Sequence, residues 1–296
     1  MIPLKDNLPT DRFPVLTVLL VVINVAVFVW QTQFPTDREL QRAGLESLDQ
    51  SSLEYGAIPY RITHPDNDRC FFAKVPQDGG GVADEVVCEG TLELRQAQEI
   101  VGESVQNPSG EVGQIGEPIP LDQAVWWVTI ITSMFMHGGI LHLGGNMLFL
   151  WIFGNNIEDS MGRPRFILFY LLAGLVAVYA QALLDTGSTV PTIGASGAVA
   201  GVLGGYALLH PRARVLTLVL IIFFVTLIEV PAVVMLGIWF VLQFLPAVGQ
   251  AATPDFGGGG VAYFAHVGGF VFGLAAIKLF ANRHREREIE PPYPVY

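Results

Sequence analysis

The chain is 296 residues long, with 51% hydrophobic and 15% charged residues and a mean hydropathy of +0.47. This composition is too apolar for an ordinary soluble domain and indicates a polytopic membrane protein. The net charge of −11 belongs to one segment, because 17 acidic and 6 basic residues lie between Thr32 and Gln123. The rest of the chain is neutral overall, and no basic patch in the sequence suggests nucleic-acid binding.

Membrane-spanning helices need about 20 predominantly apolar residues, and the sequence offers six candidate stretches. The first, from Phe13 to Trp30, is not followed by a small-residue cleavage site, so we expect a retained span rather than a signal peptide. A membrane-associated segment up to Met136 is expected before the second span, and an interfacial piece starting at Val215 before the fifth. The second to sixth spans are expected at 141–153, 166–184, 195–209, 231–248 and 262–280.

Basic residues determine which way these spans point. Outside the long first loop, lysines and arginines fall in the two termini and in the second and fourth loops, whereas 185–193 and 250–263 contain none. The positive-inside rule therefore predicts cytoplasmic termini, since long loops translocate largely regardless of their charge. The sequence predicts an all-α, multi-pass protein of the plasma membrane, and the absence of a transit-like presequence favours a bacterial inner membrane over an organelle.

The acidic segment between the first and second spans is longer than a loop requires. Glycines at 79–81 and the run 107–110 interrupt it, and part of it is expected to be a small folded insertion, although no clear period shows which part. Both cysteines of the chain, Cys70 and Cys88, lie in this segment. A disulfide between them and a pair of free thiols remain equal alternatives, because two cysteines give no framework pattern.

Four polar residues fall at one depth of the predicted bundle. Spans 2, 4 and 6 all run from the outside inwards, and each has polar residues in its first turns. His142 and Asn146 lie in span 2, Ser196 in span 4 and His266 in span 6. Intramembrane ionisable residues are costly to bury and are therefore candidates for function.

Glycine spacing supplies a second constraint. Span 4 carries small residues at intervals of four on two faces, and span 6 carries Gly269 and Gly273 on about the same face as His266. Two such faces pack at a short interaxial distance, and this contact brings His266 towards Ser196. A serine whose only role is helix packing would show the same geometry, so the packing and catalytic interpretations coincide.

These residue types suit acyl-transfer chemistry. Serine is a weak nucleophile that needs an adjacent base, and His266 in its neutral form can serve as one. His142 and Asn146 share a helix face and can both donate hydrogen bonds to a developing oxyanion, although an interhelical hydrogen bond is the simpler role for His142 and an interfacial position for His137. Spans 2 to 6 have no acidic residue at this depth, so we expect a Ser–His dyad and slow turnover.

Three motifs in this order resemble those of the rhomboid intramembrane serine proteases. They are His137, His142 and Asn146 at spacings of five and four, Gly194-Ala195-Ser196-Gly197, and Ala265-His266-Val267-Gly268-Gly269. The resemblance implies a six-transmembrane-helix rhomboid fold with a long extracytoplasmic first loop. It also implies Ser196 as nucleophile and His266 as base, with an oxyanion hole formed by His142, Asn146 and the Ser196 backbone N–H.

The resemblance further implies a division of the chain and a class of substrate. The division is a cytoplasmic N-terminus and first span (1–31), an acidic extracytoplasmic insertion (32–123), a catalytic core (124–281) and a cytoplasmic tail (282–296). The implied substrates are single-span membrane proteins that are cleaved near the outer membrane face. They reach the site from the lipid bilayer, past span 5 and the loop 250–260, and no cofactor or metal is expected.

Three features depart from the family pattern. Members often have the dipeptide Trp-Arg in the first loop. This chain has Trp126-Trp127 there, followed by Val128-Thr129 without an arginine. Position 200 is alanine, where some members have an aromatic residue that stacks on the histidine, so the orientation of His266 must come from elsewhere. The insertion is also longer than a minimal first loop.

Two other functions have specific sequence requirements that can be compared with this chain. A catalytically inactive rhomboid-like protein that binds membrane clients would usually lack the serine or the histidine, and this chain has both. A transporter with His142 and His266 as a proton relay would need a polar path across the bilayer. The inner halves of spans 4 and 6 offer no such path.

Overall fold

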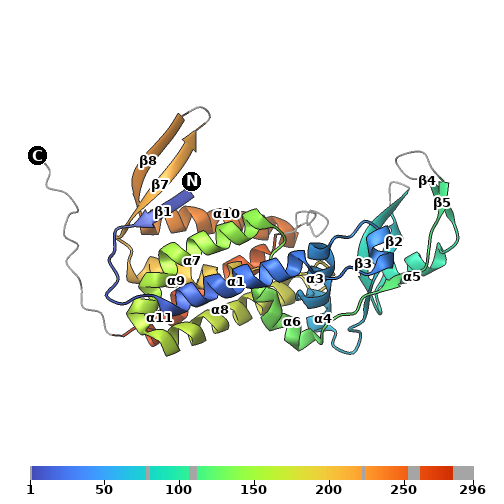
Figure 1. Ribbon diagram of the computed structural model, residues 1–296, viewed down its shortest axis with the longest axis horizontal. Coiled ribbons are helices and arrows are strands. Elements are labelled where there is room, and N and C mark those ends of the chain that lie inside the picture. Colours follow the sequence, from blue (N-terminus) through green and yellow to red (C-terminus); the bar gives the residue numbers. More distant parts are fainter. Residues whose placement is uncertain (1, 78–80, 107–111, 222–223, 253–260, 283–296) are drawn as a thin grey trace, which may run out of the picture.

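The computed structural model describes residues 2–77, 81–106, 112–221, 224–252 and 261–282. A bundle of long helices forms its larger part, and a smaller α/β domain stands at one end of the bundle (Figure 1). The predicted tail from residue 283 onwards, and the loop from residue 253 to 260, lie outside the described residues. The long helices are α1 (Val15–Thr32), α7 (Ile140–Met161), α8 (Arg163–Leu184), α9 (Ser196–Leu209), α10 (Ala232–Ala252) and α11 (Tyr263–Phe280).

These helices make the chain a multi-pass membrane protein. Among the described residues, α1, α8, α10 and α11 are each long and apolar enough to cross a membrane. A fifth span arises if α7 is joined to α6 (Trp126–Thr132) and the short turn Ser133–Phe135, across a bend of 77°. The remaining predicted span, the fourth at 195–209, coincides with α9, which is apolar but only 14 residues long.

α9 lies inside the bundle, where it contacts α7, α8, α10 and α11. Every residue from Gly197 to Tyr206 is buried, which fits a helix that is apolar on all sides. The predicted spans therefore correspond to observed helices in their order, and most boundaries agree within a few residues. The largest difference is at α7, which continues beyond Phe153 to Met161.

The acidic segment folds into the α/β domain. Its sheet has the antiparallel order β3 (Val82–Cys88), β2 (Cys70–Pro76), β6 (Ile119–Pro120), and Cys70 lies opposite Cys88 and is bonded to it by a disulfide. A second, two-stranded sheet pairs β4 (Ser104–Gln106) with β5 (Val112–Gln114). The helices of the domain are α2 (Arg38–Arg42), α3 (Ser47–Tyr55), α4 (Pro59–Thr63) and α5 (Leu92–Glu99).

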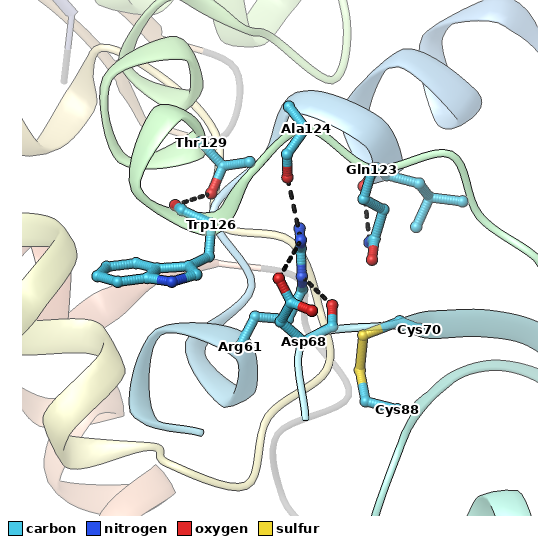
Figure 2. A network of polar contacts seen from close by, with 9 residues as sticks. Arg61, Asp68, Cys70, Cys88, Gln123, Ala124, Trp126 and Thr129 are labelled. Atoms are coloured by element: carbon cyan, nitrogen blue, oxygen red, sulfur yellow. Dashed lines mark hydrogen bonds and ion pairs between the residues drawn. A yellow bond between two sulfur atoms is a disulfide. The ribbon is translucent and has the colours of Figure 1, made fainter. Parts of the chain in front are cut away.

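A buried arginine ties this domain to the chain that leads into the bundle (Figure 2). Arg61 on α4 donates hydrogen bonds to the carbonyl oxygens of Asp68 and Ala124, and it forms an ion pair with the Asp68 carboxylate at 3.7 Å. Burial lowers the pKa of Arg61, and the nearby Asp68 carboxylate opposes that shift. Because Ala124 lies two residues before the start of α6, these bonds tie the domain to the segment that leads into the bundle.

A third sheet corrects the all-α prediction. β1 (Ile2–Asp6), β7 (Arg214–Ile221) and β8 (Phe224–Pro231) form an antiparallel sheet in the order β1-β7-β8 at the opposite end of the bundle (Figure 1). The segment expected to be an interfacial piece is therefore a β-hairpin. Its sequence is rich in Val, Ile, Thr and Phe, which favour strands, and pairing with β1 satisfies the backbone groups along one edge of β7.

Asp6, the last residue of β1, joins this sheet to the bundle through buried hydrogen bonds. Its carboxylate accepts a hydrogen bond from the Tyr206 hydroxyl on α9 at 2.6 Å and another from Asn156 Nδ2 on α7 at 2.7 Å. Burial raises the pKa of Asp6 above its ordinary value of 3.8, and the hydrogen bonds only partly oppose this. Burial therefore makes ionisation of Asp6 less favourable in the folded protein than in water.

Asp6→Asn is expected to change how stability depends on pH. Because the folded-state pKa of Asp6 lies above its ordinary value, its contribution to the free energy of unfolding is greatest below pH 3.8. That contribution is lost as the pH rises through the folded-state pKa. The melting temperature of Asp6→Asn minus that of the wild type should therefore increase from about pH 4 towards pH 7 in detergent solution. A difference in melting temperature that stays constant across this pH range would contradict the raised pKa of Asp6.

Candidate active site

Ser196 is the first residue of α9, and the backbone turn in front of it depends on a glycine. Gly194 has a φ of +119°, which a residue with a side chain rarely adopts. A Cβ at this position would also lie 2.8 Å from Nε2 of His142 and 3.5 Å from Oγ of Ser196. The glycine therefore allows both the turn and the close approach of the His142 ring to the backbone at position 194.

Glycines also bring α11 against α9. A Cβ on Gly269 would overlap the carbonyl oxygen of Gly197, and a Cβ on Gly273 would overlap that of Gly201. On the other helix, a Cβ on Gly204 of α9 would overlap the carbonyl oxygen of Phe270 on α11. The two backbones are thus in direct contact over several turns, as the glycine spacing predicts.

Gly269→Ala is expected to disrupt this contact. The added methyl group would meet a backbone oxygen, which cannot turn aside as a flexible side chain can. Overpacking of this kind costs about 1–3 kcal/mol, so the melting temperature should fall and the distance between α9 and α11 should increase. Gly237→Ala on α10 is the matched control, because a Cβ there meets nothing within 4 Å. Equal melting temperatures for the two variants would argue against the close contact.

Ser196 and His266 meet across the contact between α9 and α11. Nε2 of His266 lies 2.8 Å from Oγ of Ser196, which is hydrogen-bonding distance. Both residues are partly exposed. His266 comes from the first turn of α11, where the sequence expects it.

The other ring nitrogen of His266 has a partner that sequence reasoning missed. Nδ1 lies 2.8 Å from Oε1 of Gln243 on α10. Trp239, one turn earlier on the same helix, has its ring centroid 6.0 Å from that of His266. A signal was present in the sequence, because Gln243 is the one polar side chain between Ala232 and Val248.

Two side-chain donors lie on α7, as expected for an oxyanion site. Asn146 is 8% exposed, and within the described ranges its buried Nδ2 has no hydrogen-bond partner. A buried donor without a partner is costly, so this amide is suited to a ligand that supplies an oxygen. His142 is exposed, and its ring reaches Gly194 in front of Ser196.

His137 is fully buried, and its ring packs against that of His142. Its ring centroid lies 5.2 Å from that of His142, in an edge-on arrangement. Its backbone N–H donates to Oε1 of Gln31 on α1 at 2.8 Å, and its Nδ1 lies 3.2 Å from the carbonyl oxygen of Phe135. His137 therefore touches the candidate site through the ring of His142.

A small cavity of about 20 Å³ opens beside the serine, with room for about one water molecule. Ser133, Gly194, Ser196, Gly197 and Ala265 contribute to its lining. Among the described residues, no three or more His, Cys, Asp or Glu side chains are grouped so that they could hold a metal ion.

Comparisons with known proteins match the same part of the chain. Residues 124–283 fit the model of the rhomboid domain. The mitochondrial Rhomboid protein 1 of Saccharomyces cerevisiae is 33% identical over 171 residues, which are 55% of this chain and 45% of the relative. The rhomboid protease GluP of Bacillus subtilis is 42% identical over 82 residues, which are 28% of this chain and 15% of GluP.

A human relative, the mitochondrial presenilin-associated rhomboid-like protein, is 32% identical over 87 residues, 29% of this chain and 23% of the relative. The chain thus matches less than half the length of each of these relatives. The domain model covers more than half of the chain and includes every residue of the candidate site. On this basis the chain belongs to the rhomboid family.

Proposed function

We propose that this protein is an intramembrane serine protease that uses Ser196 as nucleophile and His266 as general base. The observation that carries the proposal is the 2.8 Å contact between His266 Nε2 and Ser196 Oγ, in a site that is partly exposed. Family membership supports it, because rhomboid proteins are generally intramembrane serine proteases.

The proposed reaction is acyl transfer through a covalent intermediate. His266 takes the hydroxyl proton of Ser196 while Oγ attacks the carbonyl carbon of the scissile peptide bond. The oxyanion that develops accepts hydrogen bonds from Asn146 Nδ2, the His142 ring and the backbone N–H of Ser196. The imidazolium then gives its proton to the leaving amine, and a water molecule beside Ser196 hydrolyses the acyl-enzyme with His266 again as base.

We propose single-span membrane proteins as substrates, because their scissile bonds would approach the site from the bilayer. The proposed topology has six membrane helices, with α9 among them and both termini in the cytoplasm. Residues 32–123 then face the outside, which agrees with the disulfide between Cys70 and Cys88, since disulfides persist in oxidising compartments. A plasma membrane, such as a bacterial inner membrane, meets this condition.

The test uses purified protein in liposomes with a fluorophosphonate probe and a panel of single-span substrates. The wild type should be labelled and should cleave at least one substrate, whereas Ser196→Ala should do neither. Ser160→Ala is the matched control, because this serine lies at the far end of α7 and donates only to the carbonyl oxygen of Ile157 among the described contacts. Labelling of Ser196→Ala, or substrate binding without cleavage by the wild type, would overturn the proposal and favour an inactive client-binding protein.

A further inference from the structure

We propose that Gln243 is a positioning residue that holds the His266 ring and selects its tautomer. This inference rests on the proposed function, because it assigns a partner to the proposed base. The observation is the 2.8 Å contact between Gln243 Oε1 and His266 Nδ1, on the side of the ring opposite Ser196. The site is thus a line of three side chains from three helices, α9, α11 and α10.

The chemistry of the three groups fixes the direction of the hydrogen bonds. An amide oxygen can only accept, so Nδ1 must carry the ring proton when it faces Oε1. In a neutral imidazole the other nitrogen then has a free lone pair, and Nε2 can accept the proton of the Ser196 hydroxyl. The opposite tautomer would direct an N–H at the serine and could not activate it.

The surroundings of Gln243 on α10 indicate that its contact with His266 has a role in function. Between Ala232 and Val248 every other side chain is apolar, and several neighbours on α10 face outwards, among them Leu242 at 60% exposed and Leu245 at 62%. An amide in such a helix is costly unless it is paired. Gln243 pairs with the one ring whose orientation the proposed reaction requires.

Trp239 adds a second restraint from the same helix. It lies four residues before Gln243, and its ring is tilted by 41° against the His266 ring. Together the two side chains take the place of an aromatic residue at position 200, where this chain has alanine. α10 therefore orients His266 by one hydrogen bond and one ring contact.

A simpler role for Gln243 is helix cohesion, since amide side chains commonly bond across membrane helices. That role predicts a change in stability but none in the tautomer of His266 or in the pH profile. Among the described residues, the titratable side chain that interacts electrostatically with His266 is His142 on α7. Substitutions at position 243 leave His142 unchanged, so any shift of the pH profile of kcat reports on that position.

The experiment compares Gln243→Leu and Gln243→Glu with the wild type in liposomes. Gln243→Leu removes the acceptor at similar volume, and it should lower kcat and the fluorophosphonate labelling rate by about tenfold or more, with KM within about twofold. Gln243→Glu retains an acceptor and adds a charge that stabilises the imidazolium. It should keep most of the activity at high pH, and the acid limb of its kcat profile should move to higher pH.

The matched control is Gln250→Leu. It makes the same substitution on the same helix, but Gln250 Nε2 donates to Asp185 at 3.2 Å and not to His266. Its acid limb should coincide with that of the wild type. Wild-type kcat in Gln243→Leu, or an unshifted acid limb in Gln243→Glu, would overturn the inference and leave helix cohesion as the role of this residue.

A second measurement separates this inference from the proposed function. Protein labelled with ¹⁵N-histidine reports the tautomer of His266 by NMR, without any catalytic reaction. The wild type should show a proton on Nδ1, and Gln243→Leu should show a mixture of tautomers. If the wild type shows the Nδ1–H form but neither reacts with the probe nor cleaves substrates, the proposed function fails and the positioning role stands. An Nε2–H form in the wild type would overturn the positioning role.

Discussion

His266→Ala is expected to lower the rate of fluorophosphonate labelling of Ser196 by about 10²- to 10⁴-fold, the usual contribution of a general base. The reason is the loss of Nε2, which lies 2.8 Å from the serine hydroxyl and takes its proton in the proposed mechanism. The fold should survive, because glycine contacts hold α11 against α9 and His266 is partly exposed. Labelling kinetics and melting temperature, measured on the same preparation, check both statements.

The control for this variant is His64→Ala, since His64 is an exposed histidine of the α/β domain whose ring stacks on Tyr60. Its labelling rate should match that of the wild type. A fold-change below about three for His266→Ala would show that another group activates the serine, and the assignment of the base would have to be abandoned.

Asn146→Ala is expected to reduce kcat by about 10²-fold, with a smaller change in KM. Its Nδ2 donor is buried and has no hydrogen-bond partner among the described residues, so it is available for a hydrogen bond to the oxyanion that the substrate oxygen becomes. An interaction that is stronger in the transition state than in the ground state affects kcat more than KM. Steady-state kinetics on a cleavable single-span substrate measure this split.

Asn155→Ala is the matched control, because it makes the same change on the same helix, more than two turns away. Its kcat should stay close to that of the wild type. Should Asn146→Ala instead raise KM and leave kcat unchanged, the amide would be a ground-state substrate contact and not an oxyanion donor.

The membrane helices and the meeting of Ser196 with His266 could be predicted from the sequence. The apolar runs are long enough to define helices, and the glycines at intervals of four mark the faces that pack. Gly269 and Gly273 lie on the face that also carries His266, so packing and proximity follow from one pattern. A periodic spacing of this kind can be recognised in a single sequence.

Other parts could not be predicted, for different physical reasons. A short apolar run does not distinguish a strand from a buried or interfacial helix, so the hairpin of β7 and β8 was missed. Gln243 is not part of a periodic pattern of polar residues on α10. Its hydrogen bond to His266 depends on how α10 and α11 are rotated relative to each other. The α/β domain depends on pairings between distant strands, such as β2 with β6, that no local pattern reveals.

The length of α9 has a consequence for how a peptide could react here. At about 1.5 Å per residue its 14 residues extend about 21 Å, whereas the hydrocarbon layer is about 30 Å thick. At least one end of α9 must therefore stop below the surface of that layer. If the end that carries Ser196 lies below the membrane surface, a helical polypeptide must unwind locally before one of its peptide bonds can reach Ser196. Sequences that unwind easily, such as those with glycine or proline, would then be cut more readily than uniformly helical ones.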